Sequence, residues 1–244
     1  MSTDNNTDQT DLTFFTNEEG QTLLSRFKAT LKDTQLFDVL VGYFRISGFY
    51  QLYNAIEPLE KVRILVGLSV DRESYKIMQY HQKSSTIDFE SHQRTKKLYQ
   101  QNLKEEVENS NENDSNIEVG IRKFIEFLQT DCPNPEADKA RNGNGKKLEI
   151  RAYPTRNIHA KVYIGRFKPD DRDYGFVITG SSNFSESGFV ANREFNVELR
   201  QKRDVQFAEK QFNNLWKDAV DISEDFVDTI QIRTWLNDQI LPYE

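Results

Sequence analysis

Hydrophobic positions near the front of the chain recur first with helical and then with strand spacing. In residues 18–31 the apolar side chains lie three or four positions apart, which predicts a helix with one buried face. Residues 37–43 and 62–68 are short, mostly apolar runs, as buried strands are. Ser47 and Gly48 open a second helix between them. Two buried strands joined by a helix form a βαβ unit, so these strands are predicted to lie parallel in one sheet.

The middle of the chain, residues 71–145, is far more polar. It contains two long segments of helix-forming residues, 94–109 and 117–130. Runs rich in Asn, Asp, Ser and Gly at 109–115 and 142–145 are predicted loops. We therefore expect a helical insertion that lies over or beside the sheet.

Strand patterns return after the predicted insertion. They cover residues 148–153, 158–165, 174–179 and 194–200, and a helical pattern over 204–220 follows. The expected fold class is α/β, a mixed β-sheet flanked by helices, with one helical insertion. We assign residues 13–244 to a single domain, since 244 residues suit one large domain that carries an insertion.

The first twelve residues are rich in Asn, Asp and Thr and are expected to be disordered. They have neither the basic start nor the apolar core of a signal peptide, and no apolar run of about 18 residues occurs. The single cysteine, Cys132, rules out an intrachain disulfide and a cysteine-based metal cluster. We expect a cytoplasmic protein without a membrane span.

Charge restricts the kinds of partner. A net charge of −7 argues against a protein that coats nucleic acid non-specifically, because that mode needs a broad basic surface. Positive charge is nevertheless concentrated in residues 151–172. The candidates for binding substrate phosphates are Arg156, Arg166, Lys168 and Arg193.

Candidate chemistry lies in and after the predicted strand 158–165. Side chains alternate along a strand, so His159 and Lys161 are expected on one face and the neighbouring apolar residues on the other. Such a pair alone means little. Downstream come the turn Gly180-Ser181-Ser182-Asn183 and then Asn192-Arg193-Glu194, and it is the ordered combination that indicates a site.

These three motifs, in this order, resemble the phospholipase D superfamily, specifically nuclease-like members with a single His-x-Lys motif. The segment 42–48 and the strand after it also look like the first βαβ unit of those domains. In that family an Asp usually follows five residues after the lysine, and this chain has Arg166 there. The departure puts full activity in question, although that Asp is commonly viewed as structural support.

The resemblance implies a role for each motif residue, and the chemistry of the side chains agrees. His159 is the expected nucleophile, which would form a phosphohistidine. Lys161, Ser181 and Asn183 would stabilise charge on the phosphoryl oxygens in place of a metal. Glu194 would accept the ring N–H of the histidine, with Glu198 as the competing candidate.

Because the chain carries a single copy of the motif, a second copy of the chain is expected to complete the site. A second histidine must protonate the leaving oxygen and later activate water, so we expect a homodimer with one composite site. No cofactor and no metal are expected, and His81 and His92 have no second ligand at metal spacing.

Family resemblance does not choose the substrate. Nucleic acid, DNA foremost, is favoured because the residues around the motif are polar and basic. The first alternative is a nucleic-acid-binding or regulatory module with weak or no hydrolysis, within a larger helicase-type repair or phage-defence protein. The second is a lipid phosphodiesterase, which would need an apolar mouth to the site.

Overall fold

The computed structural model describes residues 13–18, 20–67, 93, 96–97, 100–101, 115–153 and 158–233. Its strands form one sheet of eight, in the order β1-β7-β6-β5-β2-β3-β4-β8. The strands are β1 (Phe14–Thr16), β2 (Thr34–Val41), β3 (Lys61–Gly67), β4 (Leu148–Tyr153), β5 (Lys161–Phe167), β6 (Gly175–Gly180), β7 (Phe195–Leu199) and β8 (Val220–Asp221).

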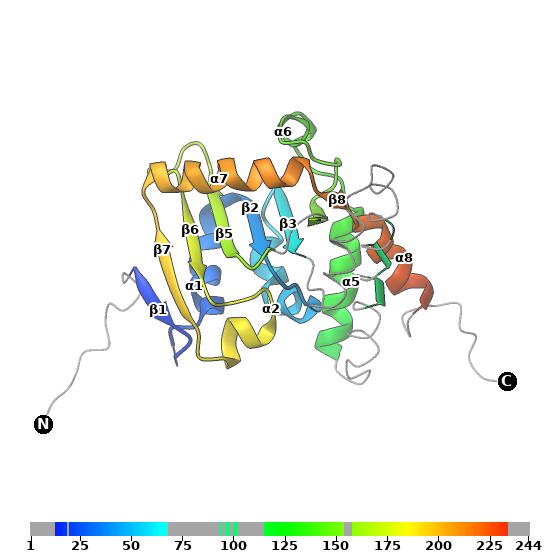
Figure 1. Ribbon diagram of the computed structural model, residues 1–244, viewed down its shortest axis with the longest axis horizontal. Helices are drawn as coiled ribbons and strands as arrows, with labels where there is room; N and C mark the ends of the chain where they lie inside the picture. The colour runs from blue at the N-terminus through cyan, green and yellow to red at the C-terminus, as the bar shows by residue number, and fades with distance from the viewer. Residues whose placement is uncertain are drawn as a thin grey trace, which may run out of the picture.

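The helices cover both faces of this sheet (Figure 1). They are α1 (Leu23–Thr30), η2 (Leu31–Asp33), α2 (Ile46–Ile56), α5 (Ser115–Gln129), α6 (Pro135–Ala140), the π-helical turn η3 (Ser187–Ala191), α7 (Lys202–Lys217) and α8 (Ser223–Arg233). None of the helices in the described part of the chain is long and apolar enough to cross a bilayer.

The predicted mixed α/β sheet is confirmed. Strands β2, β3 and β4 are parallel to one another, and the pairs β2–β5, β5–β6 and β6–β7 are antiparallel. The helix α2 connects β2 to β3, as the βαβ pattern predicted. Consequently the carboxyl ends of β2 and β3 lie at the same end of the sheet as the start of β5 and the end of β6.

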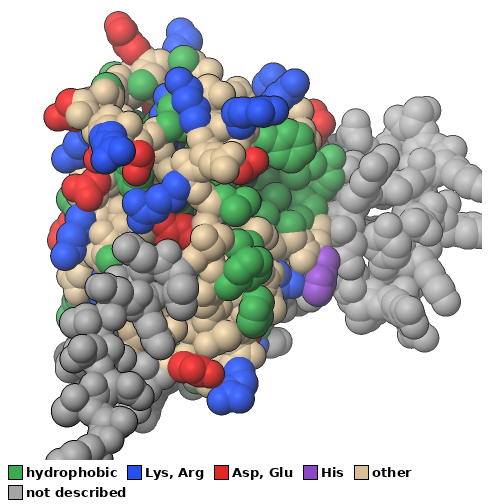
Figure 2. Space-filling model, turned by 90° about the vertical axis from the view of Figure 1, so that its left-hand side faces the viewer, with side chains coloured by type: hydrophobic (Ala, Val, Ile, Leu, Met, Phe, Trp, Pro, Cys, Tyr) green, Lys and Arg blue, Asp and Glu red, His purple; other side chains and the backbone are tan. Residues whose placement is uncertain are grey.

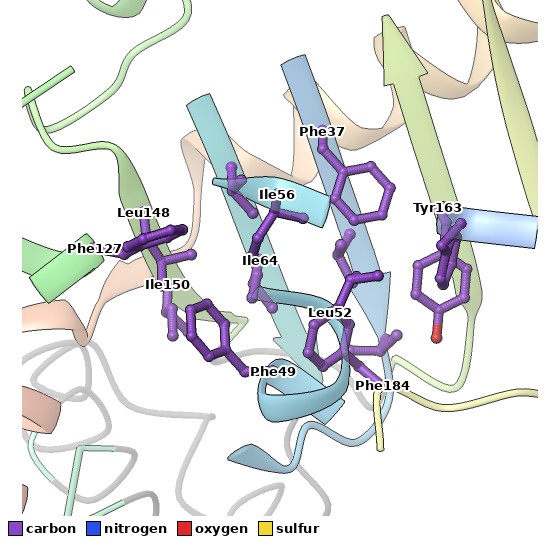
Figure 3. Close-up of a cluster of buried hydrophobic side chains, with 14 of the residues drawn as sticks. Phe37, Phe49, Leu52, Ile56, Ile64, Phe127, Leu148, Ile150, Tyr163 and Phe184 are labelled. Atoms are coloured by element: carbon purple, nitrogen blue, oxygen red, sulfur yellow. The ribbon is translucent and has the colours of Figure 1, made fainter. Parts of the chain in front are cut away.

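The larger core fills the space between one face of the sheet and α1, α2, α5 and α8. Figure 3 shows side chains from β2 to β5 meeting those of α2 and α5 there. Phe49 of α2 lies edge-on to Phe124 and Phe127 of α5, at centroid distances of 5.1 and 5.5 Å. Part of the predicted insertion 71–145 therefore contributes to the main core. That residues 71–145 form a helical insertion within one domain stays a prediction.

The other face of the sheet is covered by α7, which packs Val205, Phe212 and Trp216 onto it. Under this helix lies an ion pair that the apolar strand patterns did not reveal. Arg63 is fully buried and donates to both carboxylate oxygens of Asp38 at 2.7 Å. Burial opposes ionisation of Asp38, but Arg141 and Arg63 outweigh it and hold the pKa of this carboxyl below its usual value.

Several predicted boundaries were wrong. The first helix begins at Leu23 rather than at residue 18, because the Thr22 hydroxyl caps it by accepting from the Ser25 N–H at 3.1 Å. The strand predicted over 158–165 begins at Lys161 and runs on to Phe167, so His159 precedes it. The last predicted helix ends at Lys217, because the chain then forms β8 on the edge of β4. The short strand β1 was not predicted.

Three predictions fall outside the described residues: the disordered segment 1–12, most of the helix 94–109, and the surface positions of His81 and His92.

Candidate active site

The predicted motif residues gather at one end of the sheet because of its strand register. Val162 of β5 pairs with Thr179 of β6, and Thr179 pairs with Val197 of β7. The segment before β5, the turn after β6 and the residue before β7 are therefore neighbours. They carry His159, Ser181 with Asn183, and Glu194.

Two glycines allow the histidine segment to lie across the strand ends. The Ile158 carbonyl oxygen lies only 2.7 Å from where a Cβ of Gly42 would be, and 2.4 Å from where one of Gly67 would be. Any side chain at either position would collide with this backbone. The Gly42 N–H also donates to the Ala160 carbonyl at 2.9 Å. These contacts position His159 at the carboxyl ends of β2 and β3.

His159 and Lys161 form a close pair. The lysine Nζ lies 3.3 Å from His159 Nδ1 and 3.5 Å from Nε2, and it donates to the His159 carbonyl at 3.2 Å. Lys161 is only 8% exposed, whereas the histidine is exposed to solvent. A fixed ammonium thus lies beside an accessible imidazole, which is the arrangement that an incoming phosphate requires.

Burial lowers the pKa of the Lys161 ammonium, and the negative charge of Glu194 partly offsets that effect. Glu194 therefore acts on this site through its charge even though no hydrogen bond joins it to His159 among the described residues. Its carboxylate accepts from the Ser181 hydroxyl and, at 3.3 Å, from Asn192 Nδ2. The predicted acceptance of the histidine N–H stays a proposal.

Glu198, the competing candidate, forms ion pairs away from His159. It is buried, accepts from Arg200 Nε at 2.7 Å and lies 3.4 Å from Arg26 Nε. The ion pair with Arg26 joins β7 to α1. The structure therefore favours Glu194 over Glu198 as the carboxylate of the site.

Buried hydrogen bonds to Ser182 stabilise the turn after β6. The Tyr163 hydroxyl donates to the Ser182 carbonyl at 2.8 Å, and Asn196 Nδ2 donates to the Ser182 hydroxyl at 3.0 Å. Next to it, Asn183 Oδ1 is buried with no hydrogen-bond partner in the described structure. A buried amide oxygen is costly unless something satisfies it. This oxygen is an acceptor, so a hydrogen bond from Asn183 to a phosphate would have to come from Nδ2 instead.

Not all predicted substrate-binding residues reach this site. Arg166 lies near the far end of β5, about 17 Å from Lys161 at the usual rise of a strand, and Lys168 lies just beyond that end. Arg193 is exposed beside Glu194, and its Nη2 lies 3.8 Å from Glu18. Arg156 lies outside the described residues.

The sequence did not predict an exposed aromatic pair that lies near the site. Phe14 of β1 and Phe195 of β7 are each 59% exposed, with ring centroids 5.8 Å apart, and Phe195 directly follows Glu194. Hydrophobic side chains gather on this side of the molecule, close to the histidine (Figure 2). In the sequence Phe195 alternates with Val197 and Leu199, which is the pattern of a buried strand face, so its exposure could not be predicted.

Within the described residues no group of three or more His, Cys, Asp or Glu side chains could hold a metal ion.

Comparison with known proteins agrees with the resemblance to the phospholipase D superfamily. A family model described as cardiolipin synthase, PLD-like domain, matches residues 39–216, well over half of the chain. A search of curated proteins finds no match.

Solved structures with a similar fold include two bacterial proteins of about the same extent. NucT from Helicobacter pylori is 12% identical, with a TM-score of 0.39, over 82% of this chain and 90% of that chain. The phospholipase D family member Nuc from Salmonella typhimurium is 12% identical, with a TM-score of 0.42, over 85% of this chain and 95% of that chain. Phosphatidylserine synthase from Haemophilus influenzae Rd KW20 is 12% identical, with a TM-score of 0.46, over 86% of this chain and 39% of that chain.

Proposed function

This chain belongs to the phospholipase D-like family, and from that premise we propose that it is a metal-independent phosphodiesterase that cleaves nucleic acid, DNA foremost. One observation carries the proposal: an exposed imidazole, His159, with a buried ammonium 3.3 Å from its ring. A phosphodiester seated there meets a nucleophile and a fixed positive charge together.

In the proposed reaction His159 attacks phosphorus and forms a P–N bond while the bond to the leaving oxygen breaks. A second histidine donates a proton to that oxygen and afterwards takes one from water, which attacks phosphorus and releases His159. Lys161 and the Asn183 amide bind the phosphoryl oxygens as charge develops. Ser181 holds Glu194, whose charge supports protonation of Lys161.

The second histidine is proposed to be the partner subunit's His159, since His159 is the single histidine in the described part of the chain. The functional unit would be a homodimer with one composite site. Association with a helicase domain and a cytoplasmic location stay predictions.

Arg166 favours the alternative function, a binding or regulatory module, because it replaces the usual Asp. Its position weakens that argument. Arg166 lies at the far end of β5, where it donates to Glu209 at 3.2 Å and stacks on Tyr174 with its Cζ 3.6 Å from the ring centroid. A carboxylate lost from this position is not lost from beside His159, so cleavage is still expected.

The proposal is tested with single- and double-stranded DNA and RNA, and with phospholipid vesicles, in the presence of EDTA. We expect cleavage of DNA that survives chelation. Measurable binding of DNA without cleavage of any nucleic acid would favour the module, and release of lipid headgroups alone would favour the lipid phosphodiesterase.

The alkaline limit of activity should depend on Glu194. Burial lowers the pKa of Lys161, so the protonated lysine is lost below its ordinary value of 10.5 as pH rises. Glu194→Gln removes a charge that raises this pKa, and the alkaline limb of the rate–pH profile should therefore move to lower pH. Glu224→Gln, at an exposed site on α8, should leave the limb in place. A limb that stays fixed or moves upward in Glu194→Gln would contradict this role.

A further inference from the structure

At the end of the sheet opposite to His159, a cleft of about 880 Å³ opens between the β5–β6 connection, α6 and the first half of α7. It lies beside Arg166 and Lys168, the two predicted substrate-binding residues that do not reach the active site. In Figure 1 this is the end of the sheet where α6 and α7 lie, away from η3 and the carboxyl end of β2.

The lining of the cleft is basic in an otherwise acidic protein. Six basic and three acidic side chains contribute to it, whereas the whole chain has a net charge of −7. The basic ones are Arg141, Arg166, Lys168, Arg172, Arg200 and Lys202. Charge of one sign within a concave surface concentrates its field and attracts the opposite charge.

Three guanidiniums in this lining are held in place. Arg166 donates to both oxygens of Glu209 at 3.2 Å, Arg141 donates to Asp38 at 2.6 Å, and Arg200 donates to Glu198 at 2.7 Å. Since these groups are fixed by carboxylates, little side-chain entropy remains to be lost when an anion binds near them.

Three further cations have no ion-pair partner in the described part of the chain, although Asp171 and Asp173 on either side of Arg172 also line the cleft. Lys168, Arg172 and Lys202 are exposed, and none of them forms an ion pair with another described residue. Lys168 and Arg172 lie on the β5–β6 connection, and Lys202 lies at the start of α7, so the three cations line two sides of the cleft. That helix has no side-chain cap at Gln201, but Asp204 in its first turn offsets its N-terminal dipole, so the positive charge here comes from the side chains.

We propose that this cleft is a second nucleic-acid-binding site, which binds backbone phosphates of the strand whose scissile phosphate lies at His159. This inference rests on the proposed function and extends it. Cations spread over two walls suit a series of phosphates better than one small anion. The two sites are about 17 Å apart along β5 and lie on opposite faces of the sheet, so a stacked strand that reaches both has more than about five nucleotides between them.

The test compares two double variants that each remove two exposed lysines. Lys168→Gln with Lys202→Gln alters the cleft, and Lys28→Gln with Lys217→Gln, on α1 and at the end of α7, is the matched control. Affinity for single-stranded DNA of 3 and of 20 nucleotides is measured against salt, in a His159→Ala background that prevents cleavage. Hydrolysis of bis(p-nitrophenyl) phosphate is measured with His159 intact.

In the cleft variant the 20-mer should bind about tenfold more weakly at 0.1 M salt, and the slope of log affinity against log salt should fall by about 1.4. The 3-mer, which cannot span both sites, should bind as before. Equal losses in the cleft variant and the control, or no loss for the 20-mer, would overturn the cleft proposal.

The chromogenic substrate separates this inference from the proposed function. It is too small to reach the cleft, so both double variants should hydrolyse it as the unaltered chain does. If the unaltered chain hydrolyses neither this substrate nor DNA, the phosphodiesterase fails, while a selective loss of 20-mer affinity still supports the cleft as a nucleic-acid-binding site.

Discussion

His159→Ala is expected to lower kcat for phosphodiester cleavage by about 10⁴-fold or more, the scale on which removal of a covalent nucleophile acts. The ring is exposed, so the variant should fold normally. Measurement of cleavage under EDTA, together with a thermal unfolding curve, distinguishes loss of chemistry from loss of structure.

Mixing this variant with the unaltered protein tests the composite site. If each site needs one His159 from each subunit, a fully exchanged equimolar mixture should retain about a quarter of the activity of the same total amount of unaltered protein. Independent monomers would retain about half. Full activity in His159→Ala itself would show that the proposed nucleophile is wrong.

Lys161→Gln should lower kcat by about 10²- to 10³-fold, as loss of a preorganised charge at a developing oxyanion does. Glutamine can still donate hydrogen bonds but cannot supply the positive charge 3.3 Å from the histidine ring. The measurement is the hydrolysis of bis(p-nitrophenyl) phosphate at saturating substrate, with thermal unfolding as the check on folding of this buried position.

The matched control is Lys168→Gln, which removes the same charge just beyond the far end of the same strand. It should change hydrolysis of this small substrate less than about twofold, because charges separated by more than a Debye length are largely screened. An equal effect of both substitutions would mean that Lys161 acts only through the general field of the protein.

Several features of the fold followed from the sequence, because they depend on local pattern. The apolar runs of β2 and β3 with a helix between them predicted a parallel pair, and the later strand patterns predicted further strands of a mixed sheet, whereas their antiparallel pairing came from the structure. The buried pair of Asp38 and Arg63 was not predictable, since a polar residue in an apolar run does not reveal which charge it will meet.

The sequence by itself determined the α/β class and the chemistry available to the site: an imidazole, an ammonium, an amide and a carboxylate in a fixed order. Only the tertiary structure decided which residues share that site. Lys161 and Arg166 are five residues apart, but an extended strand carries them to opposite ends of the sheet. Glu194 is far from Lys161 in sequence, yet the register of β5, β6 and β7 brings its charge to bear on that lysine. Periodicity specifies the face of a strand, whereas strand order and register specify which strand ends meet.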